Sequence, residues 1–164
     1  MMMDRRSILT GGAIGLMATL AGCSGRAEAT NGEAFPIRYT EAQWRERLTP
    51  AEFRILRGHG TERRFSSPLD EEHRRGTFTC AGCDNRLFSS ATKFDSGTGW
   101  PSFYRPLTGA IGTTVDTTLG MTRTEVHCAD CGGHLGHVFR DGPRPTGLRY
   151  CMNGVAMDFV AARS

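Results

Sequence analysis

The chain has 164 residues, of which 20 are lysine or arginine and 17 are aspartate or glutamate, so its formal net charge is +3. This charge is too small, and the basic residues are too scattered, to indicate a nucleic-acid-binding protein. Hydrophobic residues make up 38% of the chain, a modest share for one small core. We therefore expect a bound metal to contribute to stability.

An export signal is predicted for residues 1–22. The segment Asp4-Arg5-Arg6-Ser7 precedes an apolar run that is too short to span a bilayer, and small residues end it as they do at a cleavage point. The paired arginines resemble a twin-arginine signal. Leu20-Ala21-Gly22-Cys23 resembles a bacterial lipobox, so we expect Cys23 to carry a lipid and to become the first mature residue. The alternative is a plain signal peptide in which Cys23 is an ordinary thiol.

The residues after the signal divide into a tether and one domain. Residues 23–36 are small, polar and aperiodic, as in a flexible linker. Residues 37–164 have the length of a single compact domain. This organisation predicts an exported protein on the periplasmic side of a membrane, held there by its lipid anchor alone.

Two short helices should open the domain. Thr40 with Gln43, and Thr49 with Glu52, have the spacing of a capping box. Beyond residue 77 the pattern changes to short β-rich runs separated by glycine and proline, among them residues 77–79, 121–126 and 148–152. Such runs predict antiparallel strands around one core. The expected fold class is therefore mainly β, a β-rich α+β protein.

Four cysteines come in two pairs, Cys80 with Cys83 and Cys128 with Cys131. Each Cys-x-x-Cys turn offers two thiolates, and four thiolates satisfy the tetrahedral preference of zinc. The 44 residues between the pairs exceed the spacing of a small zinc ribbon, so the site should join two distant hairpins and be structural. The alternative is two disulfides, because an exported protein meets an oxidising compartment. A twin-arginine signal favours zinc, since that route exports proteins that are already folded.

Cys151 has no other cysteine two or three residues away. Strand alternation would place Arg149, Cys151 and Asn153 on one face, with Tyr150 and Met152 on the other. The positive charge of Arg149 would lower the pKa of the thiol, and Asn153 could donate a hydrogen bond to a substrate. The alternative is an inert buried cysteine.

His134 and His137 come shortly before this segment. On a regular strand they would face opposite ways, whereas a bulge or turn at Gly136 could bring both inward. With four cysteines available to one metal ion, an acid/base role is attractive for these histidines. Metal ligation and plain exposure are the alternatives.

A glycine-rich segment precedes Trp100. Gly97 and Gly99 allow an unusual backbone path there, and the indole could form one wall of an apolar pocket. Trp100 could equally be a core residue, and for Phe103 we expect the core.

Together these segments resemble the methionine-R-sulfoxide reductases, the B-type family that reduces one sulfoxide epimer of methionine. The resemblance extends over about 120 residues, from Tyr39 to Val160, and so over one domain. The matching segments are residues 57–63, the two cysteine pairs, and residues 99–103, 133–139, 141–143 and 145–153.

This resemblance implies two small antiparallel sheets with N-terminal helices, and a structural zinc ion held by the four paired cysteines. It implies that Cys151 attacks the sulfoxide sulfur and that Trp100 packs on the substrate methyl group. The other site residues that it implies are Gly99 and Phe139 for substrate binding, and His134, His137, Asp141, Arg149 and Asn153 for catalysis.

The expected chemistry depends on a proton. A sulfoxide sulfur is electrophilic when its oxygen is protonated or strongly hydrogen-bonded, and the histidines are the expected proton source. Attack would release methionine and leave Cys151 as a sulfenic acid. Many family members have a resolving cysteine where this chain has Thr98, so we expect an outside, thioredoxin-like thiol to regenerate Cys151. The resemblance implies a repair enzyme for oxidised proteins and peptides, and we expect a monomer.

Two other functions compete with this interpretation. A lipid-tethered zinc module that binds a protein partner would leave Cys151 as a passive core residue. A Cys–His hydrolase would instead form an acyl-enzyme on esters or amides.

Overall fold

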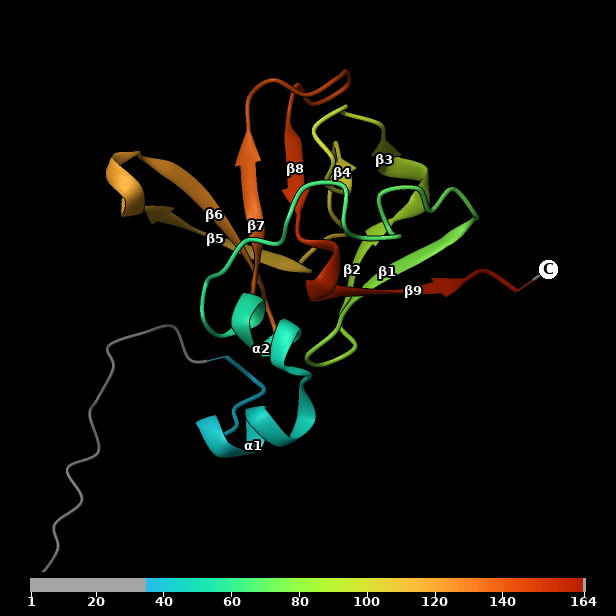
Figure 1. Ribbon diagram of the computed structural model, residues 1–164. Helices are drawn as coiled ribbons and strands as arrows, with labels where there is room; N and C mark the ends of the chain where they lie inside the picture. The colour runs from blue at the N-terminus through green and yellow to red at the C-terminus, as the bar shows by residue number, and fades with distance from the viewer. Residues whose placement is uncertain (1–34, 164) are drawn as a thin grey trace, which may run out of the picture. The chain divides into compact units, whose positions relative to one another are not determined.

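The computed structural model describes residues 35–163 (Figure 1). The predicted export signal, the lipidation site Cys23 and all but the last two residues of the predicted tether lie outside the described residues. Within the described range, Phe35 already packs its ring edge-to-face on His127. No helix between residues 35 and 163 is long and apolar enough to cross a membrane.

The two predicted helices are present, as α1 (Glu41–Arg47) and α2 (Pro50–Leu56). Both begin with the predicted capping box, in which a threonine side chain accepts from the backbone of the third helical residue, whose own side chain bonds back. After α2, the Gly58 N–H donates to the Phe53 carbonyl oxygen. α2 packs against strand β7 (His134–Phe139) and against the short 3-10 helix η3 (Gly154–Ala156), as Figure 1 shows.

The remaining elements form two antiparallel sheets, which confirms the mainly β fold class. The smaller sheet has the order β2-β1-β9, and the larger has the order β3-β4-β8-β7-β6-β5. The smaller sheet consists of β1 (Gly76–Cys80), β2 (Arg86–Ser89) and β9 (Met157–Ala161). The larger consists of β3 (Lys93–Phe94), β4 (Ser102–Phe103), β5 (Ile111–Asp116), β6 (Arg123–Cys128), β7 (His134–Phe139) and β8 (Arg149–Met152). The 3-10 helix η1 (Ser90–Thr92) connects β2 to β3.

Aromatic rings fill the space between the two sheets. Phe88 of the smaller sheet stacks on Phe103 of the larger, with 4.3 Å between the ring centroids, and Phe78 meets Phe103 edge-on at 4.9 Å. All three side chains are fully buried. The prediction that Phe103 is a core residue is confirmed, and this packing holds β4 beside β8.

Strand register brings one residue from each of five strands into line across the larger sheet. Paired residues of neighbouring strands point to the same face, and the pairs run from Ser102 through Cys151, His137 and Glu125 to Thr114. We call these five residues the polar row. The row places the lone thiol directly opposite a histidine on the adjacent strand.

A bulge in β7 brings the second histidine to the same place. Val126 pairs with Gly136 but His127 pairs with His134, so Leu135 is an extra residue. The rings of His134 and His137 consequently meet, with centroids 5.4 Å apart. A side chain at Gly136 would overlap the carbonyl oxygen of Cys151. The expectation that an irregularity near Gly136 unites the two histidines is confirmed.

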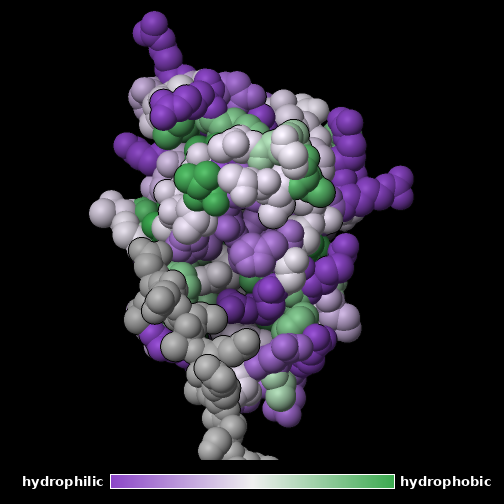
Figure 2. All heavy atoms as spheres, turned by 90° about the vertical axis from the view of Figure 1, so that its left-hand side faces the viewer, coloured by the Kyte–Doolittle hydropathy of each residue, from purple (hydrophilic) through white to green (hydrophobic). Residues whose placement is uncertain are grey.

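The β5–β6 hairpin carries exposed apolar side chains. Val115, Leu119 and Met121 lie on it or on its connecting 3-10 helix η2 (Thr118–Gly120), with 74%, 82% and 53% of their surfaces exposed. Figure 2 looks onto the side from which this hairpin projects in Figure 1, and it shows apolar residues in the upper part of that face. At the loop end of the hairpin, Asp116 pairs with Arg123, and both residues serve the site described next.

Candidate active site

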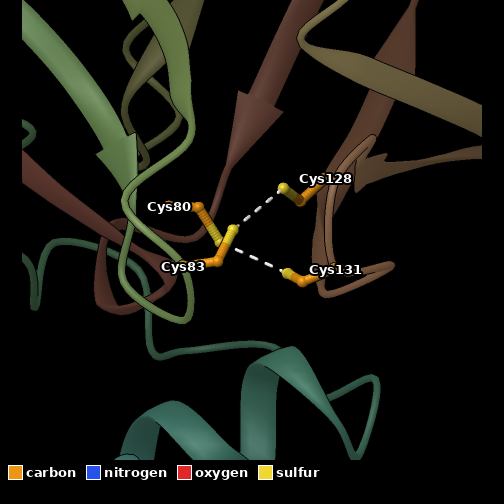
Figure 3. A group of neighbouring side chains, drawn as sticks. All are labelled: Cys80, Cys83, Cys128 and Cys131. Atoms are coloured by element: carbon orange, nitrogen blue, oxygen red, sulfur yellow. Dashed lines mark hydrogen bonds between the residues drawn. The ribbon is translucent and has the colours of Figure 1, made fainter. Parts of the chain in front are cut away.

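The four paired cysteines come together from two turns, as Figure 3 shows. Their Sγ atoms all lie within 4.8 Å of one another, with 3.7 Å between Cys80 and Cys131 and 3.6 Å between Cys83 and Cys128. A tetrahedral ion with sulfur at 2.3 Å would need edges of about 3.8 Å. A disulfide would need sulfurs about 2.05 Å apart, so these distances favour the predicted metal site over the disulfide alternative.

The two turns have matching backbone geometry. The residue after each pair, Asp84 or Gly132, adopts a left-handed conformation with φ of 61° or 67°. Its N–H donates to the carbonyl oxygen of the first cysteine, at 2.8 Å for Cys80 and 2.9 Å for Cys128. Asn85 Nδ2 donates to Cys128 Sγ at 3.4 Å. These bonds help to set the positions of the sulfurs.

Cys151 opens into a small cavity of about 150 Å³. The lining residues are Thr61, Trp100, Arg123, Gly136, His137, Phe139, Cys151, Met152 and Asn153. A larger hollow of about 640 Å³ lies over the smaller sheet, but its lining has no cysteine, tryptophan or buried acid/base pair. The reactive groups therefore select the smaller cavity, whose size suits a side chain better than a cofactor.

A hydrogen bond from the edge of its ring fixes the orientation of the Trp100 indole. Trp100 Nε1 donates to the carbonyl oxygen of Glu62 at 3.3 Å, which leaves the ring to form a wall of the cavity. Gly99 is in the left-handed region with φ of 86°, its carbonyl accepts from the Phe65 N–H, and a side chain there would overlap the Phe65 ring. Gly99 thus positions Trp100 and does not itself line the cavity.

Burial and three polar neighbours shift the pKa of the Cys151 thiol in opposite directions. Burial raises its pKa, while a hydrogen bond with Thr98, the charge of Arg149 and a hydrogen bond with Ser102 each lower it. The Thr98 Oγ1 lies 3.9 Å from the sulfur. Arg149 acts in the predicted direction, but burial outweighs it, and the thiol form is favoured until a substrate or base changes the balance.

His137 is bound by an aspartate that the sequence did not predict. Its Nε2 donates to Asp116 Oδ2 at 2.7 Å, and the Arg123 guanidinium donates to the same oxygen at 2.6 Å. Burial lowers the pKa of His137, against the opposing effect of Asp116. The imidazole is therefore held neutral, in one tautomer and one orientation.

His134 is almost completely buried, at 2% exposed, and its Nδ1 donates to Glu125 Oε1 at 2.7 Å. The same oxygen accepts from His59 Nδ1 at 2.9 Å. Within residues 35–163, the Nε2 of His134 has no hydrogen-bond partner. His134 therefore belongs to a cluster beside His137, in which neither Glu125 nor His59 was predicted.

Asp141 and Arg149 form a two-pronged ion pair. Arg149 Nε donates to Asp141 Oδ1 at 2.9 Å, and its Nη2 donates to Oδ2 at 2.7 Å. The guanidinium also lies over the ring of Phe139, 4.5 Å from its centroid. Asp141 does not line the cavity; its contact with the site is through Arg149.

Asn153 was expected to face a substrate beside Cys151, but its polar atoms have protein partners. Its Oδ1 accepts from the Glu62 N–H at 2.9 Å, and its Nδ2 donates to the Leu135 carbonyl at 3.1 Å. Strand β8 ends at Met152, so the assumed alternation does not reach Asn153. Glu62, also not predicted, caps η3 by accepting from the N–H groups of Gly154 and Val155.

Comparisons with known proteins agree with this geometry. The SelR domain matches residues 48–161. The peptide methionine sulfoxide reductase MsrB of Agrobacterium fabrum is 56% identical over 124 residues, covering 75% of this chain and 92% of that protein. The MsrB proteins of Leptospira interrogans, at 50% over 126 residues, and Thiobacillus denitrificans, at 55% over 121 residues, are similar over 76% and 73% of this chain and 96% and 92% of their own lengths.

The chain belongs to the MsrB family. The family resemblance seen in the sequence is confirmed, and with it the oxidoreductase class. Every predicted site residue other than Cys23 lies within the range that the SelR domain matches. In this MsrB chain the four paired cysteines are positioned to bind a metal ion, and none of them lines the Cys151 cavity.

Proposed function

We propose that this chain reduces methionine-R-sulfoxide in peptides and proteins to methionine, with Cys151 as the nucleophile. The observation that carries the proposal is the shared cavity, in which the thiol, the Trp100 ring and the imidazole of His137 meet. The register of β7 and β8 sets the thiol directly opposite that imidazole. The relatives named MsrB supply the substrate class.

The residues that line the cavity indicate how the side chain of methionine sulfoxide would be oriented. Trp100 and Phe139 offer apolar surface to the methyl group, and His137 and Arg123 lie on the polar side, where the sulfoxide oxygen would point. Fixing the methyl group, the oxygen and the backbone in three places distinguishes one epimer at sulfur from the other. The small volume admits a side chain, so the peptide would remain on the surface.

The reaction balances as a two-electron transfer. The thiolate of Cys151 attacks the sulfoxide sulfur while His137 passes a proton to the oxygen, which weakens the S–O bond. The adduct then collapses: its new sulfur–sulfur bond and its S–O bond break as the hydroxyl transfers to the cysteine sulfur. Cys151 is thus oxidised to a sulfenic acid, and the sulfoxide is reduced to methionine. The raised pKa of Cys151 means that the thiol must first lose its proton, and a neutral His137 can accept it.

Regeneration of Cys151 would need an outside thiol. Thr98 occupies the position beside the sulfur from which a second cysteine could attack, and the other cysteines among the described residues all belong to the metal cluster. An external, thioredoxin-like thiol would attack the sulfenic acid, form a mixed disulfide with loss of water, and then release Cys151 with a second thiol. Repair of oxidised proteins is the biological role that this cycle supports.

Zinc is the metal we propose for the four cysteines. The sulfur separations fit its tetrahedral bond lengths, and an all-sulfur site without an open position is typical of structural zinc. When bound, zinc supplies charge compensation for four thiolates and no reactive group. The cysteines would then hold the β1–β2 and β6–β7 turns together.

Export as a lipoprotein remains a proposal that rests on the sequence of residues 1–23. Labelling of growing cells with a fatty-acid analogue should mark the wild-type chain and leave the Cys23→Ser variant unmarked. Equal labelling of both would exclude Cys23 as the lipid site.

The proposed activity is tested with the separated R and S epimers of N-blocked methionine sulfoxide, zinc-loaded enzyme and dithiothreitol. We expect turnover of the R epimer alone and a loss of at least about 1,000-fold in Cys151→Ser, because no other group in the cavity can attack sulfur. Absence of turnover by folded, zinc-loaded protein, or equal turnover by the variant, would favour the tethered binding module instead.

A further inference from the structure

Three atoms of metal-ligand type meet beside the proposed active site and outside its cavity. They are the Nδ1 of His59, the Oε1 of Glu125 and the Nδ1 of His134, all within 4.8 Å of one another. Glu125 Oε1 lies 2.9 Å from the His59 nitrogen and 2.7 Å from the His134 nitrogen. Two imidazoles and one carboxylate thus converge on one point from three separate segments.

The inner two ligands are held firmly. His134 lies on β7 and is 2% exposed, and Glu125 lies on the neighbouring strand β6 with only 13% of its side chain exposed. Thr114 on β5 donates to the other carboxylate oxygen, Oε2, at 2.9 Å. This bond leaves Oε1 free to face the histidines and fixes the carboxylate plane, as outer partners do in metal sites.

The third ligand is supplied by a constrained loop. His59 lies between Gly58 and Gly60, just after α2, and its φ of 51° places it in the left-handed region that is uncommon for a residue with a side chain. The N–H groups of both glycines donate to carbonyls of α2, at Phe53 and Arg54. The loop is thereby tied to the helix with its imidazole turned toward Glu125.

The cluster is open on one side. The side chain of His59 is 63% exposed, whereas those of Glu125 and His134 are largely enclosed. Water molecules could therefore complete the coordination sphere from the solvent side. Three protein ligands with an open side differ from the closed set of four sulfurs in the cysteine cluster.

We propose that His59, Glu125 and His134 form a second metal site, which binds one divalent transition-metal ion of the zinc, cobalt or nickel type. Imidazole nitrogen with a single carboxylate suits these ions, whereas calcium and magnesium prefer sets of oxygen ligands and copper(I) prefers sulfur. Binding exchanges two N–H···O hydrogen bonds for metal–nitrogen bonds, and each imidazole then carries its proton on Nε2 instead of Nδ1. The binding itself does not depend on the reductase proposal, although an ion on His134 would lie next to the proposed proton donor.

The test uses the full chain with its cysteine cluster already filled by zinc, confirmed by metal analysis. Cobalt(II) is then titrated under nitrogen and followed by calorimetry and absorption. We expect one further equivalent to bind with weak visible bands typical of nitrogen and oxygen ligands, and without the strong near-ultraviolet bands of cobalt–thiolate bonds. Sulfur bands would place the ion on Cys151 or in the cysteine cluster and overturn the proposal.

The variant His59→Asn gives the decisive comparison, because this side chain is exposed and its loss should not unfold the protein. We expect its cobalt affinity to fall about tenfold or more. His73→Asn is the matched control, since His73 is an exposed histidine that also contacts a glutamate, at 3.6 Å, and it should bind cobalt like the wild type. No additional equivalent in the wild type, or equal affinity in His59→Asn, would show the cluster to be a hydrogen-bonded triad only.

Discussion

Cys151 shows how a buried thiol can be kept protonated and still be ready to react. The apolar walls raise its pKa, while Thr98, Arg149 and Ser102 each pull the pKa back down. The thiolate is therefore costly in the free enzyme but has partners in place once it forms. An exposed, permanently ionised thiolate would instead be open to the same oxidants that damage methionine.

The pH dependence of the reaction should report this balance. The proton that His137 passes to the sulfoxide oxygen comes from the Cys151 thiol, so kcat/KM should fall once this thiol ionises in the free enzyme. The raised pKa of the thiol places this falling limb above the ordinary pKa of cysteine. Arg149→Met removes one of the groups that lower the thiol pKa, which moves this falling limb further to alkaline pH. Steady-state kinetics across pH would measure the shift, with the exposed neighbour Arg140→Met as the control. An unmoved limb in Arg149→Met would show that Arg149 does not lower the pKa of the Cys151 thiol.

Thr98 can be converted into a test of how the enzyme is regenerated. Because its Oγ1 lies 3.9 Å from the Cys151 sulfur, Thr98→Cys should allow an intramolecular disulfide after one turnover, since bonded cysteines need little further approach. Intact mass spectrometry should show that disulfide in the variant, and a trappable sulfenic acid in the wild type.

Thr113→Cys, on the distant strand β5, should give no bond to Cys151. A disulfide that involves Cys151 in the wild-type chain would contradict the proposed need for an outside thiol.

At the scale of elements, the site depends on how closely β7 and β8 approach. Gly136 sits in the bulge of β7, where a side chain would overlap the carbonyl oxygen of Cys151. Gly136→Ala should therefore force the strands apart and lower the free energy of unfolding by about 2–4 kcal/mol, within the range for strained substitutions. Urea denaturation would measure it. Gly82→Ala, where the new atom meets neighbours no closer than 3.5 Å, should cost much less.

The sequence predicts best those features that depend on residues close to one another in the chain. Thr40 and Thr49 predict the starts of their helices because a capping box involves residues three positions apart. Each cysteine pair has the same short spacing and therefore predicts a metal-binding turn. The partners Asp116 and Glu125 escaped prediction because they meet His137 and His134 only through the register of three strands. Asn153 lines the cavity with Cys151 as predicted, but its amide is bonded to the backbone of Glu62 and Leu135, and alternation along one strand does not predict these contacts.

At the scale of the whole domain, the cysteine cluster connects the two sheets. One pair lies in the turn between β1 and β2 of the smaller sheet, and the other lies between β6 and β7 of the larger. Four sulfurs brought this close need a cation to compensate them, so metal binding and folding should be coupled.

Removal of the metal should therefore loosen both sheets together. If the metal contributes about 4 kcal/mol, its loss lowers the melting temperature of a domain of this size by roughly 10–20 °C. Differential scanning calorimetry of protein treated with a thiol-directed mercurial and a chelator, then freed of mercurial by excess thiol, would measure this. Readdition of zinc should restore the original transition. A transition that does not move on metal removal would argue against a structural ion.

The three methionines among the described residues are sheltered to very different degrees. Met152 and Met157 are 0% and 4% exposed, whereas Met121 on the β5–β6 hairpin is 53% exposed. An oxidant in solution should thus convert Met121 first, which peptide mapping after brief peroxide treatment would show. Met121 lies outside the strands, between η2 and β6, and is not among the residues that line the Cys151 cavity. A reductase damaged at that hairpin would become a substrate for another copy of itself, and its upkeep would depend on a population of molecules.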